Sequence, residues 1–350
     1  MYTLRRLAYG ILVMILVVTT ISGIIFLAPV DPAQLTFGQR SDVSTVKAKT
    51  AELGLDQPLY IQLGMYLSDL SPISVLAQTP ENQRKYQPQK LWSLGNGNAL
   101  VLKFPYLRES YQSGRLVTEI LADAIPATAL LAGTAMLLAT FLGLLFGIVA
   151  ALKQHTWLDH LVSVISVFGY SLPSYVAAML FALVFGYALG EWTGLEIQGS
   201  IFVLSDFGEW QVRWRNLVLP ALALGLRPVA LITQLTRSAM LDVLSQDFVR
   251  TATAKGLSQK IVVVKHALRN ALNPIVSAIS GWFAALLTGA FFVENVFNFK
   301  GLGDATVNAL LNFDIPVVLG CVLFTSAVFI VVNLLSDLLY AWLDPRVSVS

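Results

Sequence analysis

Long uninterrupted apolar stretches constrain this chain more than any other feature of its sequence. A helix rises about 1.5 Å per residue, so about 20 apolar residues cross the hydrocarbon core of a bilayer. The chain is 56% hydrophobic, only 13% charged and has a mean hydropathy of +0.68, which is too apolar for an ordinary soluble domain. It therefore predicts an all-α polytopic membrane protein with six transmembrane helices, at roughly 7–28, 125–152, 158–190, 217–236, 275–293 and 315–343.

The first apolar stretch resembles a signal peptide, because Arg5 and Arg6 precede it. Its apolar run extends from Leu7 to Leu27, beyond the ~7–15 residues of a signal core. No clean small-residue cleavage site follows it. We therefore expect residues 1–29 to remain as an N-terminal transmembrane anchor.

The charges of the short loops predict the orientation. With a cytoplasmic N-terminus, six spans place the C-terminus in the cytoplasm too. The cytoplasmic segments then carry ten Lys and Arg residues, whereas the short outer loops 191–216 and 294–314 carry three. The segment 30–118 has nine, but long loops translocate largely regardless of charge. We expect a multi-pass protein of the cytoplasmic (inner) membrane, with both termini cytoplasmic and the large segment 30–118 extracytoplasmic, between helices 1 and 2.

This outer segment differs in composition from the rest of the chain. Residues 71–98 are rich in Pro, Gln, Asn and Ser, which favours loops, and "ALVLKFPYL" at 99–107 suits a strand. The apolar residues of "VTEILADAIPATALL" at 117–131 follow helical spacing. They predict an amphipathic helix along the outer membrane surface before the second span. A small external domain and a cover on the membrane part both remain open.

Two expected spans carry internal features. Small residues recur at every fourth position of the second span, at Ala139, Gly143, Gly147 and Ala151, which lets helix backbones approach closely. We favour packing within the same subunit over a dimer interface. The third span is long and contains Pro173, which predicts a tilt or a kink.

Motifs of catalysis and metal binding are absent from the sequence. It lacks the phosphate-binding loop G-x-x-x-x-G-K-[ST], the serine hydrolase motif G-x-S-x-G and the zinc motif H-E-x-x-H. A single cysteine, Cys321, excludes an internal disulfide, and the three histidines are scattered. Ionisable residues within spans are few: Arg227, Asp337 and, at a border, Glu294. We predict no catalytic residue, no metal site and no cofactor bound by this chain.

The segment 237–273 is unusually basic for this chain. Six bases lie between Arg237 and Arg269, against two acids, Asp242 and Asp247. The local pattern predicts a short helix capped by Ser245, a break at Gly256 and a second helix capped by Ser258. An apolar stripe of Ile261, Val264, Leu268 and Leu272 leads that second helix back to the membrane.

Three interpretations of this basic segment are possible. DNA binding is disfavoured, because spans tether the segment at both ends. A solvated basic loop, retained by the positive-inside rule, is the simpler alternative. A docking element for a cytoplasmic partner fits the pattern better.

Several motifs resemble one transporter family. "FVRTATAKGLSQ" followed by "HALRNALNPIV" is similar to the cytoplasmic loop of permease subunits of dipeptide/oligopeptide ABC importers, in which Arg250, Thr251 and Ala252 match the R-T-A-x-A-K-G form ending at Gly256. "AELGLDQPLYIQL", "NLVLPALALG", "FFVENVFNFKGLGDATVNAL" and "VNLLSDLLYAWLDPRV" extend the resemblance over most of the chain. The long outer segment resembles the B-type subunit, although residues 71–108 are longer than the usual pattern.

The resemblance implies a permease domain at 119–345, with five transmembrane helices and a coupling loop at 237–273. A short coupling helix at 246–255 would dock on an ATPase through Asp247, Phe248, Arg250, Thr251, Ala252, Lys255 and Gly256. The implied partners are a second permease subunit, two cytoplasmic ATPase subunits that bind ATP and Mg²⁺, an extracytoplasmic substrate-binding protein and membrane lipid, with no nucleic acid. Peptides are the implied substrates; nickel or another small solute is the alternative.

Residues Arg227, Glu294 and Pro173 are expected at the translocation pathway. An Arg within a span costs about 2.5–3.5 kcal/mol on insertion scales and needs a partner. One interpretation pairs Arg227 with Glu294 or with backbone carbonyls freed by Pro228. The other has Arg227 present its charge to substrate carboxylates.

Two other functional classes remain open from the residues. A proton-coupled secondary transporter needs an intramembrane relay, for which only Asp337 and Glu294 are available. A membrane-anchored receptor would bind ligands with the outer segment and signal through the basic loop. ATP turnover that needs both this chain and separate ATPase subunits would distinguish the importer from both.

Overall fold

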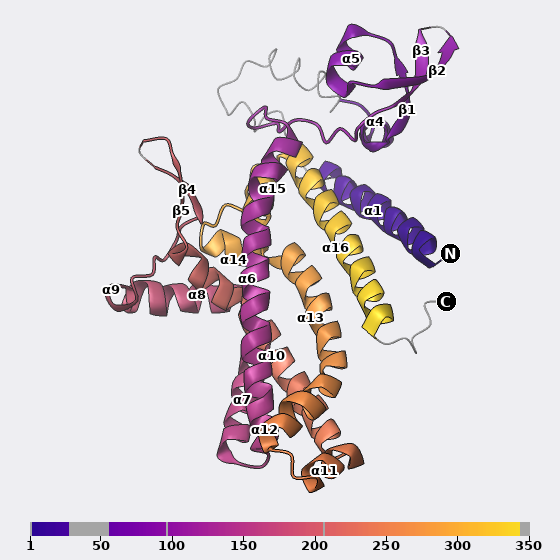
Figure 1. The fold of residues 1–350 in the computed structure, drawn as a ribbon. Coiled ribbons are helices and arrows are strands. Elements are labelled where there is room, and N and C mark those ends of the chain that lie inside the picture. The colour runs from indigo at the N-terminus through magenta and orange to yellow at the C-terminus, as the bar shows by residue number, and fades with distance from the viewer. Residues whose placement is uncertain (1, 28–55, 96, 206, 344–350) are drawn as a thin grey trace. The chain divides into compact units, whose positions relative to one another are not determined.

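The computed structural model describes residues 2–27, 56–95, 97–205 and 207–343, and the chain divides into two compact units (Figure 1). Unit 1 comprises residues 1–10, 123–307 and 325–350, and unit 2 comprises residues 11–122 and 308–324. Residues 30–55 of the expected outer segment, and Arg346 among the expected cytoplasmic bases, lie outside the described residues.

Unit 2 contains a small sheet between short helices. Its three strands are antiparallel in the order β1-β3-β2, and β3 begins at the "ALVLKFPYL" stretch that favoured a strand. The elements that lie in unit 2, or begin or end there, are α1 (Tyr2–Leu27), α4 (Leu59–Leu70), β1 (Ile73–Ala77), α5 (Pro80–Tyr86), β2 (Gln89–Gly95), β3 (Asn98–Leu102), α6 (Val117–Leu152), α15 (Leu302–Leu311) and α16 (Ile315–Leu343).

A buried carboxylate organises this unit. The side chain of Asp69, at the end of α4, accepts hydrogen bonds from Tyr86 Oη at 2.6 Å and Arg108 Nε at 2.7 Å. The Asp69 carbonyl accepts a further hydrogen bond from Lys103 Nζ at 2.9 Å. A buried polar network of this kind is stable only when its members are satisfied. It ties α4 to α5 and to the segment after β3.

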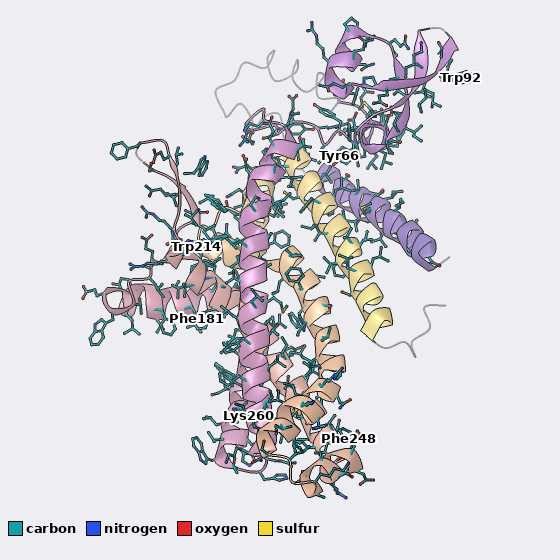
Figure 2. All side chains as sticks on the ribbon, in the orientation of Figure 1. Tyr66, Trp92, Phe181, Trp214, Phe248 and Lys260 are labelled. Carbon is teal, nitrogen blue, oxygen red and sulfur yellow. The ribbon has the colours of Figure 1, made fainter. Side chains whose placement is uncertain are left out.

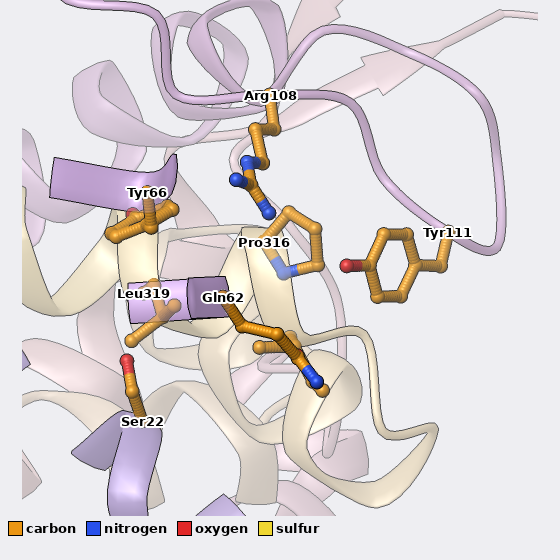
Figure 3. Close-up of a pocket in the computed structure, with 8 residues that line it drawn as sticks. Ser22, Gln62, Tyr66, Arg108, Tyr111, Pro316 and Leu319 are labelled. Carbon is orange, nitrogen blue, oxygen red and sulfur yellow. The ribbon is translucent and has the colours of Figure 1, made fainter. Parts of the chain in front are cut away.

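Unit 2 also contains a small cavity that is lined by both polar and apolar side chains (Figure 3). The Arg108 guanidinium carbon lies 5.3 Å from the centre of the Tyr66 ring. The cavity encloses at most about 260 Å³, below the ~300–1,000 Å³ of usual ligand pockets, so we assign it to packing. Its lining residues are Ser22, Gln62, Tyr66, Arg108, Tyr111, Ile315, Pro316 and Leu319.

Unit 1 is built from long helices that lie beside one another (Figure 1). The buried core lies between α6, α10 and α13 and includes Leu131, Leu224, Ile232 and Ile275. The further elements of the unit are α7 (Trp157–Ser171), α8 (Ser174–Phe181), α9 (Gly190–Thr193), β4 (Phe202–Leu204), β5 (Trp210–Val212), α10 (Arg215–Leu244), α11 (Asp247–Ala254), α12 (Gln259–Ile261), α13 (Arg269–Gly289) and α14 (Phe291–Val296), with π-helical segments at Ala182–Ala188 and Val262–Leu268.

The described residues include three to five helical spans. Val117–Leu152, Arg215–Leu244 and Ile315–Ser336 are each long and apolar enough to cross a membrane. Two helix pairs qualify if each bent pair is one span, with bends of 107° and 52°. The described apolar part of α1, Tyr9–Gly23, is shorter, so a sixth span stays a prediction.

The expectation of a separate surface helix before the second span is wrong. Helix α6 runs without interruption from Val117 to Leu152, with Pro126 inside it. Its first residues supply an apolar face that is buried, because Val117, Leu121 and Ala124 are all inaccessible. The apolar face of this pattern is therefore buried by packing within the protein.

The small residues of α6 pack within the chain, as predicted. A Cβ added at Gly143 would lie 2.6 Å from Cγ2 of Ile232, and one at Gly147 would lie 2.7 Å from the carbonyl oxygen of Thr233. Both neighbours belong to α10. The two helices approach so closely because no side chain stands between their backbones.

Candidate functional site

The expected coupling helix is present as α11, Asp247–Ala254. It lies at one end of the long helices of unit 1, where Figure 2 labels Phe248 and Lys260. Gly256 ends it in the left-handed conformation, with φ at +79°. The N–H of Leu257 donates to the carbonyl of Ala252 and that of Gly256 to the carbonyl of Thr253, a glycine-dependent helix ending. The predicted break at Gly256 is confirmed.

One face of α11 holds it against the ends of the long helices. Val249 and Ala252 are buried in a cluster separate from the main core. Ala252 was expected to contact an ATPase, but its burial gives it a positioning role. The other buried members of this cluster come from α6, α10, the segment leading into α13 and the start of α13: Ala151, Met240, Val243, Val262, Val263, Ala267 and Ala271.

The opposite face of α11 is open. The side chains of Asp247 and Arg250 are 97% and 75% exposed, and their charged atoms are 3.8 Å apart. Thr251 and Lys255 are also exposed, and Phe248 is 40% exposed. An exposed ion pair of this kind contributes little to stability, so the charges of this face are available to a partner.

Details of the basic segment differ from the sequence pattern. Gln246, not Ser245, occupies the position before α11, and the Ser245 hydroxyl donates instead to the carbonyl of Asp242. Ser258 does precede α12, but its side chain forms no capping hydrogen bond. The predicted stripe is wrong for Ile261 and Val264, which are exposed. The π-helical segment Val262–Leu268 widens the helical repeat and so changes which residues are buried.

One base of the segment is not available to a partner. Arg237 Nε lies 2.6 Å from Asp159 Oδ1, and Arg237 Nη2 lies 2.8 Å from Asp159 Oδ2. The second of these oxygens also accepts a hydrogen bond from the N–H of His155. The bidentate pair joins the start of α7 to α10 just before α11. The sequence pattern does not predict this pair, because nothing in the spacing links residues 78 positions apart.

Glu294 is buried at the other interruption of the spanning helices. Its carboxylate accepts hydrogen bonds from Thr128 Oγ1 at 2.7 Å and from the backbone N–H groups of Gly303 at 2.7 Å and Asp304 at 3.2 Å. The Thr128 hydroxyl accepts in turn from the N–H of Leu302 at 2.8 Å. These bonds satisfy N–H groups that have no partner in the first turn of a helix. Glu294 and Thr128 thus fasten α15 to α6.

The glycines of "KGLGD" permit this arrangement. A Cβ added at Gly301 would collide with Thr128 and Glu294, and one at Gly303 would collide with the backbone of Phe291. Burial raises the pKa of Glu294 to about 7, although the hydrogen bonds from Thr128, Asp304 and Gly303 lower it. We call Glu294, Thr128 and the start of α15 the Glu294 knot.

The predicted kink at Pro173 is present as a sharp break. Helices α7 and α8 meet there at a bend of 107°, and α8 runs across the direction of α7 in Figure 1. Pro173 is the N-cap residue of α8, so it lies outside the helix interior, where a proline would remove a hydrogen bond. Within a membrane, such a break is tolerated where protein buries it or where it lines a water-filled cavity.

Arg227 does not pair with Glu294, so that expectation is wrong. Its guanidinium carbon lies 5.3 Å from the centre of the Tyr170 ring and 5.9 Å from that of Trp282. Its Nε is buried and has no hydrogen-bond partner within the described ranges. Among those residues no backbone carbonyl or carboxylate accepts a hydrogen bond from this side chain. The structure brings Arg227 to Tyr170, just before the break at Pro173, and separates it from Glu294.

No group of three or more His, Cys, Asp or Glu side chains in the described part of the chain could hold a metal ion. Three features of unit 1 described above bear on function: the open face of α11, the α7–α8 break, and Arg227, which has no ion-pair partner among the described residues.

Known proteins match this chain over nearly its whole length. Residues 143–349 match the family model described as binding-protein-dependent transport system inner membrane component, and residues 1–80 match the model of the N-terminal part of such components. The dipeptide transport system permease protein DppB of Alkalihalophilus pseudofirmus is 32% identical over 99% of both chains. The probable D,D-dipeptide transport system permease protein DdpB of Escherichia coli is 34% identical over 99% of this chain and 97% of its own.

A solved structure supports the same fold. A chain of the MetNI methionine ABC transporter, in an inward-facing conformation, aligns with a TM-score of 0.53 and 14% identity, over 65% of this chain and 97% of that chain. At this identity the likeness concerns the fold alone.

Proposed function

The chain belongs to the binding-protein-dependent transport system inner membrane components, and from this premise we propose that it is the permease subunit of an ABC importer for peptides. ATP is hydrolysed in separate subunits, and this chain supplies part of the path across the cytoplasmic membrane. The relatives named for dipeptide transport support peptides as the substrate class. The alternative within the family is import of nickel or another small solute.

The open face of α11 is the observation that carries the coupling role. Val249 and Ala252 attach the helix to the ends of α6, α10 and α13, so a push on α11 is transmitted to the spanning helices. Asp247, Arg250 and Phe248 remain for a partner. A protruding aromatic residue flanked by charges suits a partner's pocket with a polar rim. We propose that this partner is an ATPase subunit.

The proposed mechanism is a rigid-body switch. Nucleotide-driven closure of two ATPase subunits moves α11 of this chain and its counterpart in a second permease subunit. The pathway then changes from inward-facing to outward-facing, because the nucleotide binds one arrangement of the assembly better than the other. The Asp159–Arg237 pair, in which the carboxylate is buried and the Arg237 side chain is partly exposed, holds α7 to α10 during this movement through its bidentate geometry.

The proposed topology has six spans, cytoplasmic termini and an extracytoplasmic segment at 30–118 that meets the substrate-binding protein. Cysteines at Gln83 and at Gln259, each placed singly in a Cys321→Ser background, test it with an impermeant thiol reagent. We expect the first to label from outside and the second from inside. Labelling of both from one side would refute the topology.

Function is tested with the complete complex in proteoliposomes. We expect uptake of labelled di- and oligopeptides, and ATP turnover that requires both this chain and the ATPase subunits. Uptake driven by a proton gradient without ATP would favour a secondary transporter. Uptake of a metal ion in place of peptides would favour the alternative substrate.

A further inference from the structure

Arg227 lies inside a candidate spanning helix and has no ion-pair partner among the described residues. It lies in α10 among apolar residues, where an Arg costs about 2.5–3.5 kcal/mol on insertion scales. Its Nε is buried and unbonded in the part of the chain that the structure describes. A charge in this setting needs compensation from its surroundings.

Two buried carboxylates of unit 1, Glu294 and Asp159, are engaged by groups other than Arg227. Glu294 is held by Thr128 and the start of α15. Asp159 forms its bidentate pair with Arg237. Among the residues that the structure covers, no Asp or Glu forms an ion pair with Arg227. The described part of the chain therefore leaves the charge of Arg227 open to an anionic group.

Two aromatic rings flank the guanidinium of Arg227 and leave its N–H donors free to bind a carboxylate. Tyr170 and Trp282 lie within cation–π distance of its central carbon, which offsets part of the cost of desolvation. The rings have no acceptor as strong as a carboxylate, so they do not use up the fork of N–H donors. That planar fork matches a carboxylate in bidentate geometry and stays charged at any working pH.

The position of this group fits a path through the membrane. Tyr170 lies in the last turn of α7, immediately before the α7–α8 break at Pro173. Breaks in spanning helices are a recurring feature of substrate sites in transporters. Arg227, Tyr170 and Trp282 come from three different helices, so a change in helix packing alters the group.

We propose that Arg227, flanked by Tyr170 and Trp282, binds the C-terminal carboxylate of a peptide during its passage through this subunit. The inference rests on the peptide import proposed above. Peptides with free ends carry this group whatever their side chains, so its recognition does not depend on peptide sequence. The competing interpretation is that the cation–π contacts only hold α7, α10 and α13 together.

The test compares trialanine with its C-terminal amide in uptake by the complete complex in proteoliposomes. The same substrate-binding protein serves every sample, so its own preference cancels when the free-to-amide uptake ratio of a variant is divided by that of the wild type. We expect Arg227→Gln to lower this ratio about tenfold, as loss of a charge-assisted hydrogen bond implies. Arg227→Lys keeps the charge without the fork and falls between.

Arg213→Gln is the matched control, because Arg213 is an exposed arginine of the same unit, 3.6 Å from Glu196. We expect the free-to-amide uptake ratio of this variant to stay at the wild-type value. Should Arg227→Gln fail to assemble, Tyr170→Leu and Trp282→Leu replace it, with an expected drop of about threefold. If the wild type does not import the amide, equilibrium binding of the two labelled peptides to the purified complex without binding protein replaces uptake.

The outcomes separate the two proposals. An unchanged free-to-amide ratio in assembled Arg227→Gln, or equal loss of both peptides, overturns the carboxylate site and leaves peptide import standing. A wild-type complex that imports neither peptide overturns the proposed function itself.

Discussion

At the two interruptions of the spanning helices, the charged side chains lie in opposite environments. After α10, the chain forms α11 and leaves Asp247 and Arg250 exposed on its open face. After α13, the chain forms α14 and α15 and encloses Glu294 in the knot. Both segments are short helices between long ones. The polar groups of the Glu294 knot are satisfied within the chain, whereas the charges on the open face of α11 are exposed.

This difference indicates where the protein needs partners. A buried carboxylate with three donors is satisfied by its own fold, so its removal is a stability event. An exposed charge contributes little to folding, so its removal should leave the fold intact and affect only what docks there. The following predictions test that division, from the largest expected effect to the smallest.

Glu294→Ala should have the largest effect. The substitution leaves the Thr128 hydroxyl and the N–H groups of Gly303 and Asp304 without their acceptor in a buried site. We expect a loss of about 2–4 kcal/mol of stability and a lower yield of assembled complex. Thermal unfolding of the purified complex measures it, with exposed Glu196→Ala as the control. A wild-type midpoint for Glu294→Ala would mean that the knot does not hold α15 to α6.

Gly256→Val should impair coupling. A β-branched residue tolerates the left-handed conformation of Gly256 poorly, and the end of α11 shifts. We expect about tenfold slower peptide uptake in a complex that still inserts into the membrane. Gly256→Asn is the matched control, because Asn adopts this conformation more readily. Equal uptake by the two variants would contradict a role for the helix ending.

Arg250→Glu should affect docking alone. It places an acid beside Asp247 on the open face and reverses the charge offered to the ATPase. We expect about threefold to tenfold less of the proposed ATPase subunit in co-purification, with an unchanged thermal midpoint of the permease. Arg213→Glu, at the distant exposed arginine, should retain the ATPase subunits. If Arg250→Glu also retains them and transports normally, the loop serves only as a topological signal.

Glu294→Gln should have the smallest effect, and one that depends on pH. Burial raises the pKa of Glu294 from 4.5 to about 7, so between these values the folded state holds a proton that the unfolded state releases. The stability of the wild type therefore falls as pH rises through this window. Gln does not titrate, so it should gain on the wild type by on the order of 1 kcal/mol from pH 5 to pH 7.

Thermal midpoints of both proteins across this pH range measure the gain. Asp304→Asn, which removes a neighbouring acid, serves as a second comparison for the pH dependence of the thermal midpoint. A difference between Glu294→Gln and wild type that stays constant from pH 5 to pH 7 would show that Glu294 does not titrate there.

Local patterns were sufficient for features that depend on a few consecutive residues. The apolar runs predicted the helices of the spans described here, Gly256 predicted the end of α11, and Pro173 predicted the break between α7 and α8. Each rests on backbone rules that act within a turn or two. The spacing of Gly143 and Gly147 likewise predicted a close helix contact, although their partner, α10, was not specified.

The sequence alone determined the class of the protein, the α11 element and, through motifs distributed along the chain, the family. Only the tertiary structure decided which charges are paired. It joined Asp159 to Arg237 and Glu294 to Thr128, and it left Arg227 between Tyr170 and Trp282. The physical reason is that an ion pair or a hydrogen bond depends on distances of a few ångströms between helices. The spacing of residues along one helix cannot specify those distances.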